Sequence, residues 1–301
     1  MVSLLLSIII GFFPSNNLSN FNFLEDATKT PAGVSDFPYS FGPKLTAKSA
    51  IVIDVDSGKV LFEKNPEEKL PIASITKLMT ALVFLENKTK SWEDTVEVKK
   101  EDSVGSGGFS NQLEPASLAV REGDILTVKD IFYGGLIKSA NNAMKILARV
   151  VSADSGKNFV DLMNNKAQDL SMSNTHFEEP TGLDPKNYST AQDLAKLIVK
   201  AMERSEIKEA LEKKDYDVQI IKSDKSLAHL HIQNTDKLLG SFINIKGAKT
   251  GYIEESDYCL AALSQIDNHN LAVIILGAKT SENRFQEAKS LIFWANQQLN
   301  K

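Results

Sequence analysis

The chain has 301 residues, of which 42% are hydrophobic and 24% charged, so it can bury a sizeable core and is not disordered at scale. Its formal net charge is −5 at pH 7 and it contains no long basic run, which argues against a nucleic-acid partner. A single cysteine, Cys259, excludes a disulfide within the chain and a cysteine-based zinc site.

Residues 1–13 form an apolar run that is too short to span a bilayer, which takes about 20 residues, but suits the core of a signal peptide. No positive region precedes this run and no clear cleavage site follows it, so either the true start lies upstream or the run is an uncleaved membrane anchor. Residues 14–45 are mostly polar and predict a tether. We therefore expect an extracytoplasmic protein of the periplasm or cell envelope, secreted or tethered to the membrane through its N-terminus.

Two strand-like runs open the globular part of the chain. Residues 49–55 and 59–63 are rich in apolar and β-branched side chains, and Asp56-Ser57-Gly58 separates them. This pattern predicts a hairpin at the start of a domain that covers residues 46–301.

The next segment carries a serine and a lysine three residues apart. In a helix, Ser74 and Lys77 would lie on the same face, about 5–6 Å apart. The apolar residues around them cover nearly the whole helix circumference: Ile75, Leu78, Met79, Leu82, Val83, Phe84 and Leu85. This pattern indicates a buried central helix. Burial lowers the pKa of a lysine and makes it a base, although a Ser-x-x-Lys pattern alone often occurs by chance.

Helical signals dominate roughly residues 80–205, and strand signals return towards the C-terminus. The predicted helices are 128–137, with Thr127 as N-cap, 141–151, opened by Asn141 or Asn142, and 191–202, capped by Ser189 or Thr190. The predicted late strands are 244–253, 258–264 and 271–279, followed by a helix over 281–299. Short connections predict an antiparallel meander, and we expect the two early and three late strands to share one sheet.

Two further motifs follow Ser74 and Lys77 in chain order. They are Ser139-Ala140-Asn141 and Lys249-Thr250-Gly251. The combination of Ser-x-x-Lys, Ser-x-Asn and Lys-Thr-Gly is far more specific than any one of them, and it is a known signature of class A β-lactamases and penicillin-binding proteins.

The chain thus resembles the serine-type D-alanyl-D-alanine carboxypeptidases, a family of low-molecular-mass penicillin-binding proteins, from about Ala47 to Trp294. Other segments that carry the resemblance are 177–183, 189–195, Asn234-Thr235, 249–260 and Arg284. Two positions depart from the family pattern: Asn142 stands where an aspartate is usual, and Glu179 where an asparagine precedes the proline. We expect both departures to affect local packing or substrate preference rather than the reacting groups.

The resemblance implies an α+β fold of the serine β-lactamase and transpeptidase type. This fold has a five-stranded antiparallel sheet flanked by helices, an all-α subdomain, here roughly residues 80–205, and an active site between the two. It also implies catalysis without a cofactor or metal. The four histidines, His176, His229, His231 and His269, lie outside the motifs.

Acyl transfer needs a nucleophile, a base and donors for the oxyanion. Ser74 at a helix N-terminus fits the nucleophile, its own N–H fits one oxyanion donor, and Lys77 fits the base. We expect Lys249 to lie nearby and to lower the pKa of Lys77 further by repulsion. By resemblance, Ser139 passes a proton to the leaving group.

The resemblance also assigns the substrate contacts. It implies that Asn141 holds the substrate amide and that the N–H of Tyr252 is the second oxyanion donor. Gly251 has no Cβ, so the substrate backbone can approach it closely. By the same resemblance, Lys249, Thr250 and Arg284 bind the free terminal carboxylate.

The sequence therefore predicts a hydrolase that removes the C-terminal D-alanine from peptidoglycan stem peptides through an acyl-serine, and that β-lactams trap as covalent inhibitors. Three alternatives stay open. One is a D,D-endopeptidase acting on cross-links, because the chain ends soon after Trp294. Another is a β-lactamase, for which Glu178 or Glu179 would supply the deacylating base. The third is a catalytically silent sensor of β-lactams or of the cell wall.

Overall fold

The computed structural model describes residues 42–103 and 116–301. The predicted signal peptide or anchor over residues 1–13 lies outside these ranges, as does the tether as far as residue 41. Within the described ranges, no helix combines the length and hydropathy that a bilayer crossing needs.

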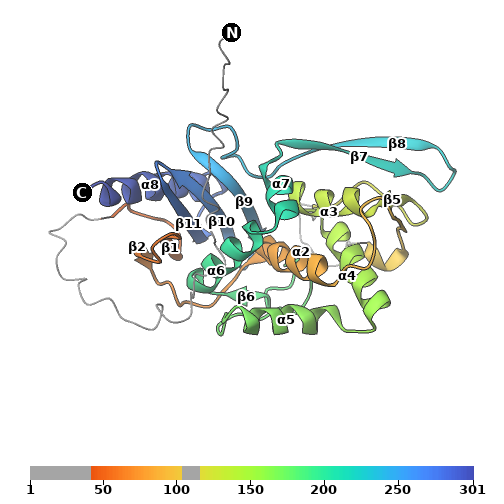
Figure 1. The fold of residues 1–301 in the computed structure, drawn as a ribbon, viewed down its shortest axis with the longest axis horizontal. Helices are drawn as coiled ribbons and strands as arrows, with labels where there is room; N and C mark the ends of the chain where they lie inside the picture. The colour runs from red at the N-terminus through yellow and green to blue at the C-terminus, as the bar shows by residue number, and fades with distance from the viewer. Residues whose placement is uncertain (1–41, 104–115) are drawn as a thin grey trace, which may run out of the picture. The chain divides into compact units, whose positions relative to one another are not determined.

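A five-stranded antiparallel sheet forms the centre of the fold (Figure 1). Its strands are β1 (Ser49–Asp54), β2 (Val60–Lys64), β9 (Asn244–Ile253), β10 (Asp257–Ile266) and β11 (His269–Ala278). The strand order is β2-β1-β11-β10-β9, so the N-terminal hairpin joins the C-terminal meander through the β1–β11 pair. The predicted sheet of two early and three late strands is confirmed, and with it the predicted α+β class.

Alternate side chains of each central strand enter different cores, because successive strand residues point to opposite faces. On β11, Ile274 packs into the core that contains α2, whereas Val273 and Ile275 pack with Phe285 and Leu291 of α8. Helix α8 (Ser281–Leu299) covers one face of the sheet, and α6 (Ala191–Met202) covers the other (Figure 1). Strands covered on both faces read as continuous apolar runs, which is why the sequence shows them clearly.

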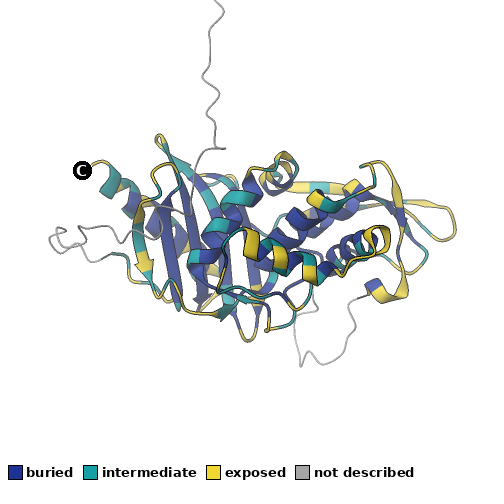
Figure 2. Cartoon of the chain, turned by 60° about the horizontal axis from the view of Figure 1, so that its bottom comes forward, coloured by how far each residue is buried: buried dark blue, intermediate teal, exposed yellow. Residues whose placement is uncertain are grey.

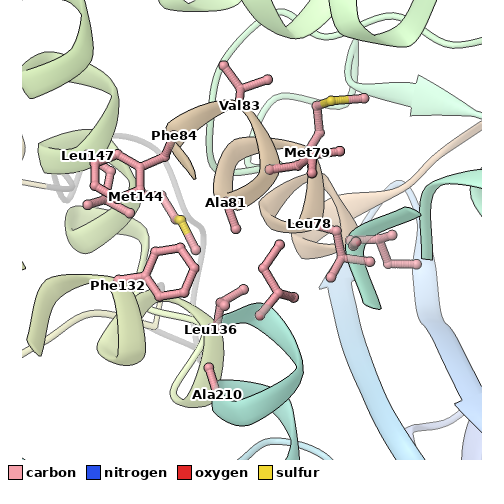
Figure 3. Close-up of a cluster of buried hydrophobic side chains, with 14 of the residues drawn as sticks. Leu78, Met79, Ala81, Val83, Phe84, Phe132, Leu136, Met144, Leu147 and Ala210 are labelled. Carbon is pink, nitrogen blue, oxygen red and sulfur yellow. The ribbon is translucent and has the colours of Figure 1, made fainter. Parts of the chain in front are cut away.

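Helix α2 (Thr76–Asn87) is the central helix that the sequence predicts, and a short 3₁₀ turn, Ala73–Ile75, precedes it. The other α-helices between the N-terminal hairpin and β9 are α3 (Val128–Ile137), α4 (Asn141–Ser155), α5 (Phe159–Asp169) and α7 (Ser205–Glu212), besides α6. Figure 3 shows Phe84 of α2 among Phe132, Met144 and Leu147 from α3 and α4. All residues from Thr76 to Leu85 are buried, so the helix has no solvent-facing side until its last turn.

The predicted helix starts are also confirmed. The Thr127 hydroxyl accepts a hydrogen bond from the N–H of Asp130 at 3.0 Å, and that of Thr190 accepts one from Asp193 at 3.1 Å. Each bond satisfies an N–H that the first helical turn leaves free. Helix α4 begins at Asn141, directly after the second motif.

The sequence did not reveal a second, four-stranded sheet. Its strands are β4 (Thr95–Glu97), β5 (Ile125–Thr127), β7 (Asp215–Ile221) and β8 (Leu227–Gln233), in the order β4-β5-β7-β8. The β7–β8 hairpin is largely exposed (Figure 2), and its strands carry many polar side chains, so it lacks the apolar runs that mark the central sheet. A two-stranded bridge of β3 (Leu70–Pro71) with β6 (Tyr188–Ser189) completes the strands among the described residues.

Truncation of Phe84 should test the importance of the α2 core. This ring is fully buried, with its centroid 5.8 Å from that of Phe132. We expect Phe84→Ala to lower the free energy of unfolding by about 3–5 kcal/mol, because it leaves a cavity in a packed core. Phe242 is 78% exposed and stacks on Phe293, so Phe242→Ala is the control, with an expected loss of no more than about 1.5 kcal/mol. Urea unfolding measures both, and equal losses would contradict this account of the core.

Candidate active site

Ser74 and Lys77 meet at the start of α2. The Nζ atom of Lys77 lies 2.6 Å from Ser74 Oγ and donates to the main-chain oxygen of Thr181, also at 2.6 Å. Lys77 is fully buried. Burial lowers its pKa from 10.5 to about 7, and the charge of Glu179 acts in the opposite direction. A large share of the lysine is therefore neutral near pH 7, in contact with a hydroxyl that it can deprotonate.

Lys249 and Ser139 form a second contact between a lysine and a serine. The Lys249 ammonium donates to Ser139 Oγ at 2.9 Å and to the carbonyl oxygen of Thr250 at 3.1 Å. Burial lowers the pKa of Lys249 well below its ordinary value, and repulsion from Lys77 and Arg284 adds to this. The predicted proximity of the two lysines is thus present, but burial, rather than Lys249, accounts for the lowered pKa of Lys77.

Ser139 lies in a strained conformation between α3 and α4. Its φ angle is +62°, in the left-handed region of backbone conformation that residues other than glycine rarely adopt. Ala73, directly before Ser74, has φ +47°. Such strain costs on the order of 1–3 kcal/mol per residue and is typical of functional sites, where the surrounding fold holds a side chain in place.

Asn141 and Asn142 have different surroundings. The Asn142 side chain pairs with the main chain of Leu118, accepting from its N–H and donating to its carbonyl oxygen, both at 2.9 Å. Asn142 therefore serves local packing, as expected. The Oδ1 atom of Asn141 is buried without a hydrogen-bond partner among the described residues. Since buried polar atoms are normally paired, this oxygen is a free acceptor at the site.

Strand β9 carries the third motif to the edge of the central sheet. The Thr250 hydroxyl donates to that of Thr235 at 2.7 Å. A Cβ atom on Gly251 would lie 2.8 Å from the carbonyl oxygen of Ile72 and 3.2 Å from the nitrogen of Ser74. The chain's own backbone next to Ser74 thus already requires glycine here, a reason that differs from the predicted approach of a substrate.

Tyr252 and Arg284 flank this strand. The Tyr252 ring is 39% exposed and stacks on Tyr258, with centroids 4.4 Å apart. Arg284 is buried on α8 and donates from Nη1 to the carbonyl oxygen of Gly251 at 3.0 Å and from Nη2 to Ser281 Oγ at 3.2 Å. Arg284 therefore joins the site through the main chain of Gly251.

The chain is similar to known D-alanyl-D-alanine peptidases over most of its length. A family profile described as D-alanyl-D-alanine carboxypeptidase matches residues 38–280. The chain belongs to this family. It is 33% identical to the D-alanyl-D-alanine carboxypeptidase DacF of Bacillus subtilis over 83% of its length and 62% of that protein. It is also 34% identical to a D-alanyl-D-alanine endopeptidase of Pseudomonas aeruginosa, over 90% and 85% of the two chains.

Solved structures agree with this family assignment. The Streptomyces K15 DD-transpeptidase matches 85% of the chain with a TM-score of 0.77 and 24% identity, which supports the fold. Penicillin-binding protein D2 of Listeria monocytogenes, solved in an ampicillin-bound form, matches 86% with a TM-score of 0.69 and 29% identity. The chain spans 62% of DacF and 62% of the E. coli carboxypeptidase DacC, so it matches less than two thirds of either relative.

Two residues that support the motif residues of this site were not predicted from the sequence. Thr181 supplies the carbonyl oxygen that accepts from Lys77, and Thr235 supports Thr250. Both stand in segments that carry the family resemblance. Each is far in sequence from the residue it contacts, however, and the repeat of a helix or strand predicts contacts only between residues a few positions apart.

In the part of the chain that the structure describes, Glu179 has no hydrogen bond to a predicted reacting group, which agrees with the expected role in local packing. Its carboxylate accepts from both the N–H and the hydroxyl of Thr181, at 2.7 and 2.6 Å. Thr181 is also the residue whose carbonyl oxygen accepts from Lys77, and the charge of Glu179 acts on that lysine. Among the described residues, no three histidine, cysteine, aspartate or glutamate side chains are grouped so as to hold a metal ion.

Gly182 offers a test of how tightly the 179–184 turn packs against Ser74. Its φ is +85°, and a Cβ there would lie 1.9 Å from the carbonyl oxygen of Ala73. We expect Gly182→Ala to lower the free energy of unfolding by more than about 3 kcal/mol, through strain and steric overlap together. Gly156 has φ +69° with nothing within 4 Å of its Cβ position, so Gly156→Ala should cost only about 1–2 kcal/mol. Similar losses in both variants would show that the contact with Ala73 is unimportant.

Proposed function

We propose that the protein is a serine D,D-carboxypeptidase that removes the terminal D-alanine from peptidoglycan stem peptides ending in D-Ala-D-Ala. The observation that carries this proposal is the 2.6 Å contact between Ser74 Oγ and the buried, deprotonatable Lys77 Nζ. Membership of the D-alanyl-D-alanine carboxypeptidase family supports it. The roles of individual residues below belong to the same proposal.

Acylation begins when Ser74 Oγ attacks the carbonyl carbon between the two terminal D-alanines and passes its proton to neutral Lys77. The oxygen of this carbonyl becomes an oxyanion, which the N–H groups of Ser74 and Tyr252 stabilise. Collapse of the intermediate breaks the C–N bond and leaves an ester on Ser74. Lys77 is fully buried, and charge interactions are stronger in a site from which water is excluded.

The leaving amine of D-alanine needs a proton. Ser139 donates its hydroxyl proton to this nitrogen and is reprotonated by the proton that Lys77 took from Ser74. Lys249, which donates to Ser139 Oγ at 2.9 Å, keeps the hydroxyl oriented for this relay. A water molecule then attacks the ester and gives a proton to Lys77, which returns it to Ser74 Oγ as the shortened peptide leaves.

Substrate binding uses the remaining motif residues. The unpaired Oδ1 of Asn141 accepts from an N–H of the stem peptide. Lys249, Thr250 and Arg284 provide the positive charge and the hydroxyl that bind the terminal carboxylate, since charge-assisted bonds to a carboxylate are the strong ones. Arg284 also holds β9 in place through Gly251.

β-Lactams should bind as covalent inhibitors, because their strained amide places a carbonyl where the D-Ala-D-Ala bond would lie. The ampicillin-bound relative from Listeria supports this. A stem-peptide substrate also requires a site in the cell envelope, and residues 1–45 would act as a signal peptide or membrane tether followed by a linker. The catalytic domain covers residues 46–301, and its helical subdomain covers roughly residues 80–205.

A D,D-endopeptidase acting on cross-links is the second candidate. The match to the Pseudomonas endopeptidase covers 90% of this chain, more than the match to DacF does, and favours this alternative. Both reactions use the same acyl-serine and differ in the amine that leaves. A β-lactamase is not favoured, because the carboxylate of Glu179 is occupied by hydrogen bonds from residues 181–184.

An intact-mass time course with benzylpenicillin tests the proposal, with Ser74→Ala as the control and D-alanine release from diacetyl-Lys-D-Ala-D-Ala assayed in parallel. We expect a persistent adduct that depends on Ser74, together with D-alanine release. An adduct without release would indicate the endopeptidase or a sensor. Rapid loss of the adduct with hydrolysed drug would indicate a β-lactamase, and no adduct would refute the proposal.

Replacement of Lys77 by arginine should separate charge from basicity. Guanidinium does not lose its proton in proteins, so Lys77→Arg should lower the benzylpenicillin acylation rate by at least about 1,000-fold. Circular dichroism should show the fold retained. Acylation at the wild-type rate in this variant would rule out Lys77 as the base.

The pH dependence of acylation provides a separate test. Lys77 accepts a proton only when neutral, and its pKa is about 7, so the acylation rate should fall as the pH drops through about 7. An isolated lysine would place this midpoint near its ordinary pKa of 10.5. The second-order rate constant with benzylpenicillin, measured across the pH range, gives the midpoint directly. A rate that is flat from pH 5 to 9 is incompatible with a lysine base of this pKa.

A further inference from the structure

The turn over residues 179–184 is organised around one carboxylate. Glu179 Oε2 accepts from the N–H and the hydroxyl of Thr181, while Oε1 accepts from the N–H groups of Gly182 and Leu183 and from the Asn187 side chain. An anion that gathers several main-chain N–H groups fixes a loop far more firmly than one neutral hydrogen bond does.

Helix α2 is fastened to this same turn. The Lys77 ammonium donates to Thr181 O at 2.6 Å, and the Thr80 hydroxyl, one turn further along the helix, donates to Pro180 O at 2.7 Å. Gly182 lies against Ala73, the residue before Ser74. The turn therefore contacts both the backbone that presents the nucleophile and the side chain of the base.

We propose that Glu179 is a positioning residue for acylation: its carboxylate closes the 179–184 turn and thereby directs the Thr181 carbonyl oxygen at Lys77 Nζ, which holds Nζ at Ser74 Oγ. This inference rests on the proposed function. Two acceptors, Thr181 O and Ser74 Oγ, fix the direction of the lysine side chain, and Glu179 determines where the first of them lies.

The charge of Glu179 has a second effect on the same lysine. The carboxylate favours the protonated form of Lys77 and so raises its pKa against the effect of burial. Among the described residues, Lys249 on β9 also interacts with Lys77 through its charge, and Asp236 and Arg284 in turn act on Lys249. Glu179 is thus the anion on the turn side of Lys77, and its removal should extend acylation to lower pH while making it slower.

Glu179→Gln, with Glu178→Gln as the matched control, tests this inference. Glu178 is adjacent in sequence, but its carboxylate is exposed and pairs with His176 at 3.3 Å. The measurement is the benzylpenicillin acylation rate of the full chain from about pH 5 to pH 9, together with the melting temperature of each variant. We expect Glu179→Gln to acylate about 10- to 100-fold more slowly at its optimum, because displacing a catalytic group by about 1 Å has costs of this size.

The acid limb is the part of the pH profile in which the acylation rate falls as the pH drops. Its midpoint separates an electrostatic effect of Glu179 on Lys77 from a general loosening of the fold. We expect the limb to lie at lower pH in Glu179→Gln than in the wild type, and Glu178→Gln to match the wild type in both rate and limb. Glu179→Asp keeps the charge but shortens the reach. It should slow acylation with the limb unmoved, so a limb that moves in Glu179→Gln but not in Glu179→Asp assigns the shift to the charge of Glu179.

Three results would overturn the inference. One is a wild-type rate and limb in Glu179→Gln. Another is a slow Glu179→Gln whose limb stays at the wild-type pH, which would make Glu179 merely structural. The third is equal effects of the substitutions at positions 178 and 179. In each case the wild-type protein still forms the Ser74 adduct, so the proposed function stands, whereas a wild-type protein without an adduct refutes that function and this inference together.

Discussion

The burial of one lysine in an apolar helix is the constraint around which the rest of the structure is arranged. Lys77 has no solvent exposure, and its Nζ atom is held between Ser74 Oγ and Thr181 O. A buried cation without partners would cost several kcal/mol, so the fold must supply acceptors and allow the proton to leave. The apolar surface of α2 creates this requirement, whereas Ser74 and the 179–184 turn, through Thr181 O, supply the acceptors. The same arrangement that makes the lysine costly also makes it reactive.

Elements whose evidence is local could be predicted from the sequence. The central strands are covered on both faces and read as apolar runs, and Thr127 and Thr190 mark helix starts by hydrogen bonds that span three residues. The β7–β8 hairpin has no such apolar run. Its inward residues, Val218 and Ile220 on β7 and Leu230 and Ile232 on β8, alternate with exposed ones, and this weaker signal was overlooked.

The motif residues of the site could also be named from the sequence, but their supports could not. Thr181 meets Lys77 across 104 positions, and no periodicity reports a contact of that separation. The missing Cβ of Gly251 was evident from the sequence, but only the folded chain shows that Ile72 and Ser74 occupy the space a Cβ would need. Glu179 drew notice as an exception to a family pattern, and its hydrogen bonds to the turn became evident only in three dimensions.

The pairing of β1 with β11 has a consequence for when the site can exist. These strands lie near opposite ends of the sequence, and Ser49 pairs with Leu276. Contacts of such large sequence separation form late and make folding slow. Ser74 and Lys77 are synthesised early, but Lys249 and the edge strand that completes the site come from the last quarter of the chain. A growing chain therefore contains the first motif long before the strand that brings the third motif against it, and the three motifs can meet only once the sheet has assembled.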